Sequence, residues 1–186
     1  MDRKTFLTLG LSACAALVAG VPTASPAHAA TGPEIDADVN ATLSRFYYQV
    51  NGAHDLVRRA AGTLVFPSIV KAGFGIGGEY GEGALRVRGR TAGYFNSVSA
   101  SVGFQLGVQA RSVIIVFMTE DALASFRSKH GWKVGVDGSV ALVTIGAGGS
   151  LDSNQIRQPV VGFILDNKGL MYNLTLEGSK ISRIAR

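Results

Sequence analysis

Apolar residues recur at helical spacing early in the chain and once in its second half. The first stretch begins at Pro33, which suits a first helical position, and ends at Asn51-Gly52; its apolar residues are Ile35, Val39, Leu43, Phe46 and Val50. A shorter helix is expected over residues 54–61. Thr119-Glu120-Asp121 has the composition of a helix N-terminus and predicts a third helix, which ends near His130.

Most of the remaining chain alternates as strands do. Residues 97–109 alternate strictly, so Val98 and every second residue after it form an apolar face that we expect to be buried. Further strands are expected over residues 111–118, 133–145, 160–165 and 170–177, the last two forming a hairpin. The order of elements predicts an α+β fold, with N-terminal helices packed on a large, curved, Gly-rich antiparallel β-sheet, barrel- or sandwich-like, and one inserted helix.

Between Phe66 and Gly89 the glycines fall largely on alternate residues. In an extended chain these positions share one face of a strand, and they are Gly73, Gly75, Gly77, Gly81 and Gly83. Glycine weakens a strand unless the strand bends or something lies very close to its backbone. We therefore expect this face to accept a close neighbour. The GxGxxG pattern at 73–78 opens no helical stripe, so it does not indicate a dinucleotide site.

The first 29 residues have the pattern of an export signal. A cationic start is followed by an apolar run over residues 6–21 and by Ala27-His28-Ala29, a small-residue cleavage site. This pattern divides the chain into a signal peptide, residues 1–29, and a single domain, residues 30–186. The expected location is the periplasm or cell envelope.

The single cysteine, Cys14, suggests an alternative to cleavage after Ala29. It lies in Leu11-Ser12-Ala13-Cys14, which resembles the lipobox of bacterial lipoproteins, and lipidation there would anchor the protein to a membrane. The apolar run continues beyond Cys14, as an uncut signal would, and this favours cleavage after Ala29.

The chain is basic, with 18 Lys and Arg against 13 Asp and Glu and a net charge of +5. Three arginines alternate at the end of the glycine-rich strand and are expected to share one face, and other cations lie near the second helix: Arg86, Arg88 and Arg90, then Arg58, Arg59 and Lys71. These cations are consistent either with a solvated rim or with a patch for anionic lipid. Basic runs interleaved with aromatic residues are missing, so nucleic acid is not expected as a partner.

Three side chains are candidates for hydrolytic chemistry: Glu79, Glu82 and His130. Two carboxylates three residues apart on a strand point to opposite faces, so they do not flank one bond. No nucleophile–base pair or metal-ligand spacing is found, and no cofactor or metal is expected.

Four blocks in order along the chain resemble the SYLF domain family: RRAAGTLVFPSIVKAGFGIGGEYGEG at 58–83, SASVGFQLG at 99–107, GAGG at 146–149 and GLMYNLTLEG at 169–178. Eukaryotic members bind phosphoinositides, and a yeast relative also binds and bundles actin filaments. The resemblance implies a lipid-binding module whose contacts are basic residues near its N-terminal segment, here Arg58, Arg59 and Lys71. For an exported bacterial protein it implies anionic phospholipid, with actin unexpected.

We therefore expect a non-catalytic lipid-binding module of the cell envelope. Phe46, Tyr47 and Tyr48 would insert into the membrane interface while the cations hold headgroups. One alternative is an envelope hydrolase that uses the two glutamates and His130. Another is a structural, self-assembling protein whose glycine face packs on a second subunit, so a homo-oligomer is left open.

Overall fold

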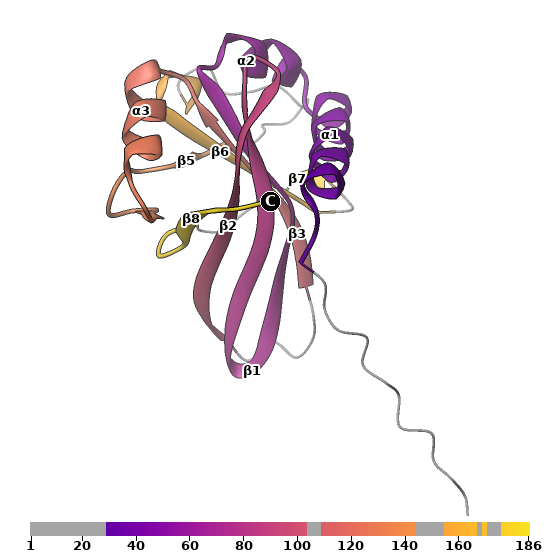
Figure 1. Cartoon of the computed structure of the whole chain (residues 1–186), viewed down its shortest axis with the longest axis vertical. Coiled ribbons are helices and arrows are strands. Elements are labelled where there is room, and N and C mark those ends of the chain that lie inside the picture. Colours follow the sequence, from indigo (N-terminus) through magenta and orange to yellow (C-terminus); the bar gives the residue numbers. More distant parts are fainter. Residues whose placement is uncertain (1–28, 104–108, 144–154, 167–168, 171–175) are drawn as a thin grey trace, which may run out of the picture.

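The computed structural model describes residues 29–103, 109–143, 155–166, 169–170 and 176–186. These residues form three α-helices and one curled, mixed β-sheet that resembles a half-barrel, which confirms the predicted α+β fold (Figure 1). The predicted signal, apart from Ala29, lies outside the described residues, as do Cys14 and the block at 146–149.

The helices begin where the sequence places their caps. Helix α1 spans Gly32–Gln49, and the Glu34 carboxylate accepts a hydrogen bond of 2.7 Å from the Thr31 backbone N–H. Helix α2 spans Ala53–Arg59. Helix α3 spans Glu120–Ser128, and the Thr119 hydroxyl accepts a bond of 3.2 Å from the Ala122 backbone N–H. All three predicted helices are confirmed.

Eight strands are described: β1 Gly62–Val87, β2 Arg90–Gly103, β3 Gln109–Phe117, β4 Trp132–Lys133, β5 Ala141–Leu142, β6 Val160–Asp166, β7 Gly169–Leu170 and β8 Lys180–Ile184. A short 3-10 helix, Gln155–Arg157, precedes β6. The order across the sheet is β4-β8-β2-β1-β3-β6-β5, with β7 paired to β6. Neighbouring strands are antiparallel except for β5 and β6, which are parallel.

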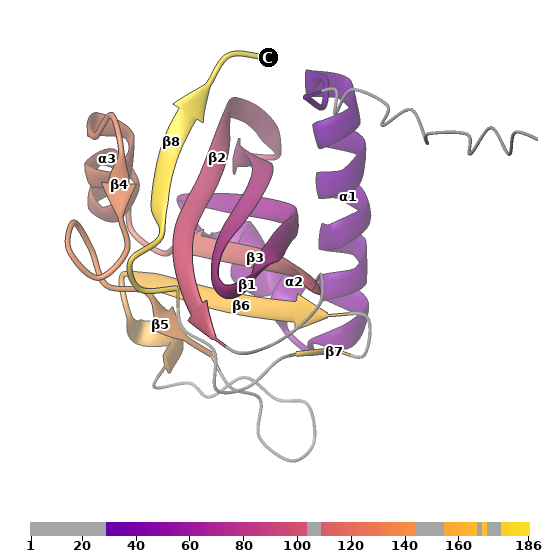
Figure 2. The same ribbon diagram turned by 90° about the horizontal axis from the view of Figure 1, so that it is seen from below.

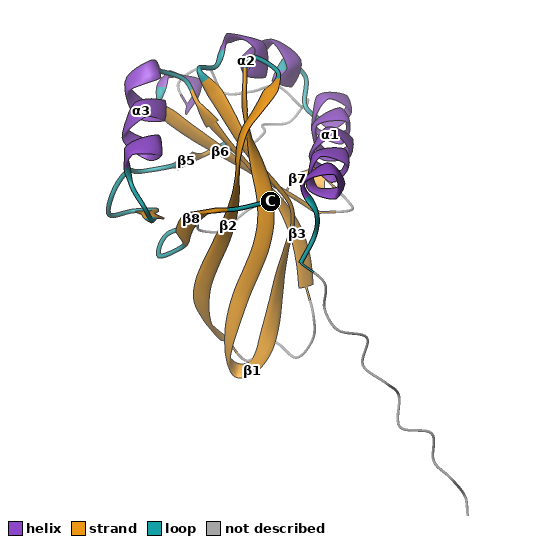
Figure 3. Cartoon of the chain, in the orientation of Figure 1, coloured by secondary structure: helices purple, strands orange, loops and turns teal. Residues whose placement is uncertain are grey.

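Helices cover both faces of the sheet. Figure 1 and the view from below in Figure 2 place α1 and α3 on opposite sides of it, and Figure 3 shows strands forming most of the fold. One apolar cluster contains Leu123 and Phe126 of α3, and the other contains Val39 and Phe46 of α1. Strand β3 lies between β1 and β6 and contributes to both clusters, which explains its continuous apolar run.

Strand β1 doubles back on itself. Residues 62–71 pair with β3, and residues 75–87 pair with β2. A Cβ atom at Gly83 would lie 2.0 Å from the Val65 carbonyl oxygen, and one at Gly81 would lie 2.6 Å from that of Ser68. A straight strand would hold Val65 and Gly83 about 60 Å apart. At Gly81 and Gly83 the close neighbour expected at the glycine face is therefore the first half of the same strand.

Two predicted strands differ in detail. The hairpin over residues 160–177 is confirmed where β6 pairs with β7. The single strand expected over residues 133–145 is wrong, because β4 and β5 are separated by a turn. In this turn Gly135 has a φ of +86°, and the Asp137 carboxylate accepts a 2.8 Å bond from the Lys133 backbone N–H.

The expected burial of β2 is reversed. Ser97 is 5% exposed, whereas Val98, on the predicted buried face, is 46% exposed. Phe95 packs into the α3-side cluster and fixes which residues of the strand face inward, so Ser97 follows it. The alternation is confirmed over residues 97–100, but the predicted assignment of its two faces to core and surface is wrong there.

Replacing Gly83 by Ala is expected to lower the free energy of unfolding by about 3 kcal/mol, because the new methyl group meets a backbone carbonyl that has no rotamer to change. The matched control is Gly78→Ala, whose Cβ would meet only the Ser99 oxygen at 3.8 Å. This control should leave stability unchanged or raise it by up to about 1 kcal/mol. Urea unfolding of both variants checks the result, and equal stabilities would contradict the close approach.

Candidate functional site

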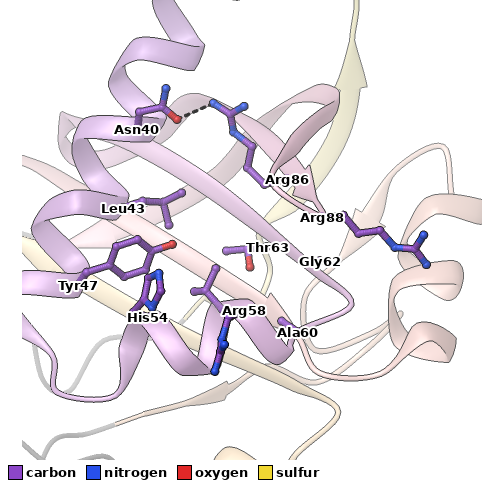
Figure 4. A pocket seen from close by; sticks show the side chains of 12 residues that line it. Asn40, Leu43, Tyr47, His54, Arg58, Ala60, Gly62, Thr63, Arg86 and Arg88 are labelled. Carbon is purple, nitrogen blue, oxygen red and sulfur yellow. Dashed lines mark hydrogen bonds between the residues drawn. The ribbon is translucent and has the colours of Figure 1, made fainter.

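A pocket of about 350 Å³ lies where α1, α2 and the turn between β1 and β2 meet. Figure 4 shows Leu43, Tyr47 and Thr63 around its hollow, while the guanidinium groups of Arg58 and Arg88 extend outward from it. The further lining residues are Asn40, His54, Val57, Ala60, Gly62, Arg86 and Gly89. The pocket therefore brings Arg58, from one predicted group of cations, together with Arg86 and Arg88, from the other.

The turn between β1 and β2 consists of Arg88 and Gly89. Val87 pairs with Arg90, and both turn residues have positive φ, +50° and +77°. A two-residue hairpin turn of this hand normally carries Asn or Gly. The prediction that Arg86, Arg88 and Arg90 share one face of a strand is therefore wrong, because the chain reverses direction between the first and the last.

Arg86 joins α1 to the sheet. Its guanidinium donates to the Thr91 hydroxyl at 2.6 Å and to the Asn40 side-chain oxygen at 2.9 Å, and it forms an ion pair of 3.3 Å with Asp36. Asp36 also accepts from the Thr91 hydroxyl at 2.8 Å and from the Tyr94 hydroxyl at 3.0 Å. Arg86 is therefore held by partners within the protein, and its first role is structural.

The two arginines that close α2 are exposed. Arg58 forms an exposed ion pair of 3.2 Å with Asp55, and the Arg59 side chain donates to the Asp55 carbonyl oxygen at 3.2 Å. Exposed pairs of this kind contribute about 0–1 kcal/mol. Both guanidinium groups can therefore exchange these partners for an external anion at little cost.

The three consecutive aromatic residues of α1 lie on different sides of the helix. Phe46 is completely buried, with its ring centroid 4.6 Å from that of Phe163, so its predicted insertion into a membrane is wrong. Tyr47 is half-buried in the pocket and lies edge-on to His54 at 5.1 Å, and burial raises its pKa. Tyr48 is 91% exposed. Successive residues of a helix point in different directions, so three consecutive aromatic residues do not share one face of the helix.

Lys71 does not join the pocket. It pairs with Gln109 at the far end of the β1–β3 ladder, and the nine residues from Gly62 correspond to about 30 Å of extended strand. The structure therefore does not bring Lys71 together with Arg58 and Arg59 as one headgroup site.

The three candidate catalytic groups are also separated. Glu79 is buried and forms an ion pair of 2.6 Å with Arg111, whereas Glu82, on the other face of β1, accepts from Tyr80 and pairs with Arg186. His130 is exposed beyond the end of α3. Each carboxylate is neutralised by an arginine, and the arrangement forms no acid–base pair with His130.

Sequence reasoning missed Asp36 and Asn40, which hold Arg86. The signal was present, since Asp36 and Asn40 are four residues apart and therefore share a helix face. Within the described residues there is no cluster of His, Cys, Asp or Glu that could hold a metal. No helix in the described part combines the length and apolar character of a membrane span.

Residues 98–185 match a family model, Ysc84, described as Las17-binding protein actin regulator. The match supports the SYLF assignment: over these residues the chain is similar to that family. It begins within β2 and ends just beyond β8, and the pocket's arginines precede it. The family comprises lipid- or actin-binding modules. No curated protein matches the chain.

The pKa of Tyr94 is raised above its ordinary value of 10.0, first by burial and then by its hydrogen bond to Asp36. The stability that depends on the neutral hydroxyl is therefore complete below pH 10 and is lost as pH rises through the raised pKa. Wild type should lose more free energy of unfolding than Tyr94→Phe between pH 8 and pH 11, measured by urea unfolding. A parallel decline in both proteins would contradict this role.

Proposed function

We propose that this protein is a non-catalytic module of the cell envelope that binds anionic phospholipid through the surface formed by α2 and the β1–β2 turn. This docking surface consists of Arg58, Arg59, Arg88 and Arg90, with the pocket between them. The family's association with lipid or actin binding supports a lipid ligand, and no enzymatic activity is known for the family.

The observation that carries the proposal is the conformation of Arg88. A non-glycine residue at φ +50° is uncommon, and the left-handed conformation costs about 1 kcal/mol. An arginine in a turn position that suits Asn or Gly gives up stability, and such local strain is concentrated at functional sites. Its guanidinium extends outward beside the pocket (Figure 4), where a membrane surface can reach it.

The charges favour an anionic surface over a single tightly enclosed ligand. All four arginines of the docking surface are exposed. Asp55, which pairs with Arg58, offsets part of their positive charge. Each cation near a negatively charged membrane contributes about 1 kcal/mol, a term that salt screens. Exposed Tyr48 at the end of α1 and half-buried Tyr47 are aromatic groups suited to the headgroup region.

The test is sedimentation with vesicles of phosphatidylglycerol and phosphatidylcholine in varied ratio. Arg88→Asn removes the charge and places a residue favoured by the turn, so it should bind about fivefold more weakly while remaining at least as stable as wild type. Arg58→Ser should have a similar effect, and the double variant should bind about 25-fold more weakly and depend less steeply on phosphatidylglycerol.

Arg127→Gln is the matched control, because it removes an exposed arginine from α3 on the other side of the sheet. Vesicle binding by this variant should equal that of wild type. Unchanged binding by the Arg58→Ser, Arg88→Asn double variant would rule out the docking surface. An equal loss in the Arg127→Gln protein would show that only net charge matters.

A further inference from the structure

A second, apolar groove lies near the start of α1 and between the two halves of β1. Its volume is about 840 Å³, and its walls include Ile35, Pro67, Val70, Tyr80 and Val98. Val70, Tyr80 and Val98 are 38%, 48% and 46% exposed, and they are three of the five large apolar side chains exposed in the described residues. Tyr80 and Val98 are direct cross-strand partners. The groove thus has a continuous apolar surface, whereas an exposed apolar side chain that lies alone does not form one.

Gly78 forms part of the groove without a structural reason for being glycine. Its φ is not in the positive range, and a Cβ there would meet only the Ser99 carbonyl oxygen, at 3.8 Å. Gly81, in the same groove, has a reason, because its Cβ would strike Ser68 of its own strand. Gly78 shares a strand face with Tyr80. A glycine inside a strand marks a bend or a close approach, and at Gly78 no described protein atom makes that approach.

Most of the groove's lining is apolar or neutralised within the protein. Three acidic residues line the groove; Glu79 pairs with Arg111 and Glu82 pairs with Arg186, so these two carboxylates are neutralised within the protein. The hydroxyl of Tyr80 is also engaged, donating to Glu82 at 2.6 Å. The third acidic residue, Asp38 of α1, is exposed and carries a negative charge. A hydrocarbon complements this lining better than a charged segment does.

The size of the groove favours one narrow ligand over a second copy of the chain. It is lined by 13 residues, whereas a stable protein interface takes about 20–30 residues on each side. Its volume is within the range of about 300–1,000 Å³ that small-molecule sites occupy.

We propose that this groove binds one acyl chain of a phospholipid, laid across Gly78 between Val70 and the Tyr80–Val98 pair. The inference rests on the proposed function for the kind of ligand, because a lipid-binding module of the envelope is exposed to phospholipid. It concerns a separate site. The groove contains none of the arginines of the docking surface, so headgroup and chain binding can be disrupted independently.

The test uses the full chain and isothermal titration calorimetry with octanoyl, lauroyl and palmitoyl lysophosphatidylglycerol, each below its micelle concentration. Affinity should rise with chain length, by at most about fourfold per methylene group buried. Gly78→Val fills the space over the backbone and should weaken palmitoyl binding at least tenfold. Ala124→Val adds a similar volume on the exposed face of α3 and should change nothing.

Circular dichroism and urea unfolding confirm that the Gly78→Val protein is folded before binding is compared. Affinity that is independent of chain length, or is equal in wild type and the Gly78→Val protein, would overturn the acyl-chain site. Light scattering that shows a dimer, dissociated by Gly78→Val, would replace the lipid by a second copy. Palmitate alone binding as tightly as the palmitoyl lysolipid would overturn the assignment to phospholipid.

Failure of the docking surface leaves a different pattern. In that case the Arg58→Ser, Arg88→Asn double variant keeps wild-type vesicle binding, while dependence on chain length and sensitivity to Gly78→Val persist. Failure of the acyl-chain site removes these last two effects and leaves the arginine variants impaired.

Discussion

The contact on which this fold depends is the approach of one half of β1 to the other. At Gly81 and Gly83 the strand lies so close to the backbone of residues 65–68 that no side chain fits. This approach lets one strand pair with β3 along its first half and with β2 along its second. The curl of the sheet follows from it, and so do the two separate apolar clusters. Helices α1 and α3 pack on opposite faces of the sheet.

The same strand sets the positions of the pocket and the groove. Its end, at the turn of Arg88 and Gly89, meets α2 and forms one wall of the arginine-lined pocket. Its middle, around Gly78, forms the apolar groove near the other end of α1. The network of Arg86, Asp36 and Tyr94 fixes α1 against the sheet between them. A rigid helix thus separates a cationic surface from an apolar one, an arrangement suited to an amphiphilic ligand.

Local patterns predicted the local structure well. Helix caps, the central strand β3 and the extended glycine segment follow from periodicity and composition, because each depends on neighbouring residues. The wrong predictions concern which side chains face the core and which residues lie close together in space. Val98 lies outward because Phe95, packed against another element, sets the inward face. Lys71 and Arg58 are close in sequence, but Lys71 lies at the far end of the β1–β3 ladder from α2. Arg86 is an anchor because of Asp36, fifty residues earlier, and the pattern along β1 itself does not show this partner.

The position of β8 has a consequence for how the chain matures. This strand, Lys180–Ile184, lies between β2 and β4, and Arg186 supplies the counter-ion of Glu82. Synthesis proceeds from the N-terminus, so residues 180–186 leave the ribosome after every other element of the sheet. Until then β2 has an unpaired edge and Glu82 has no counter-ion. The sheet is therefore completed by the last of its strands to be synthesised, and β2 keeps an open edge until β8 pairs with it.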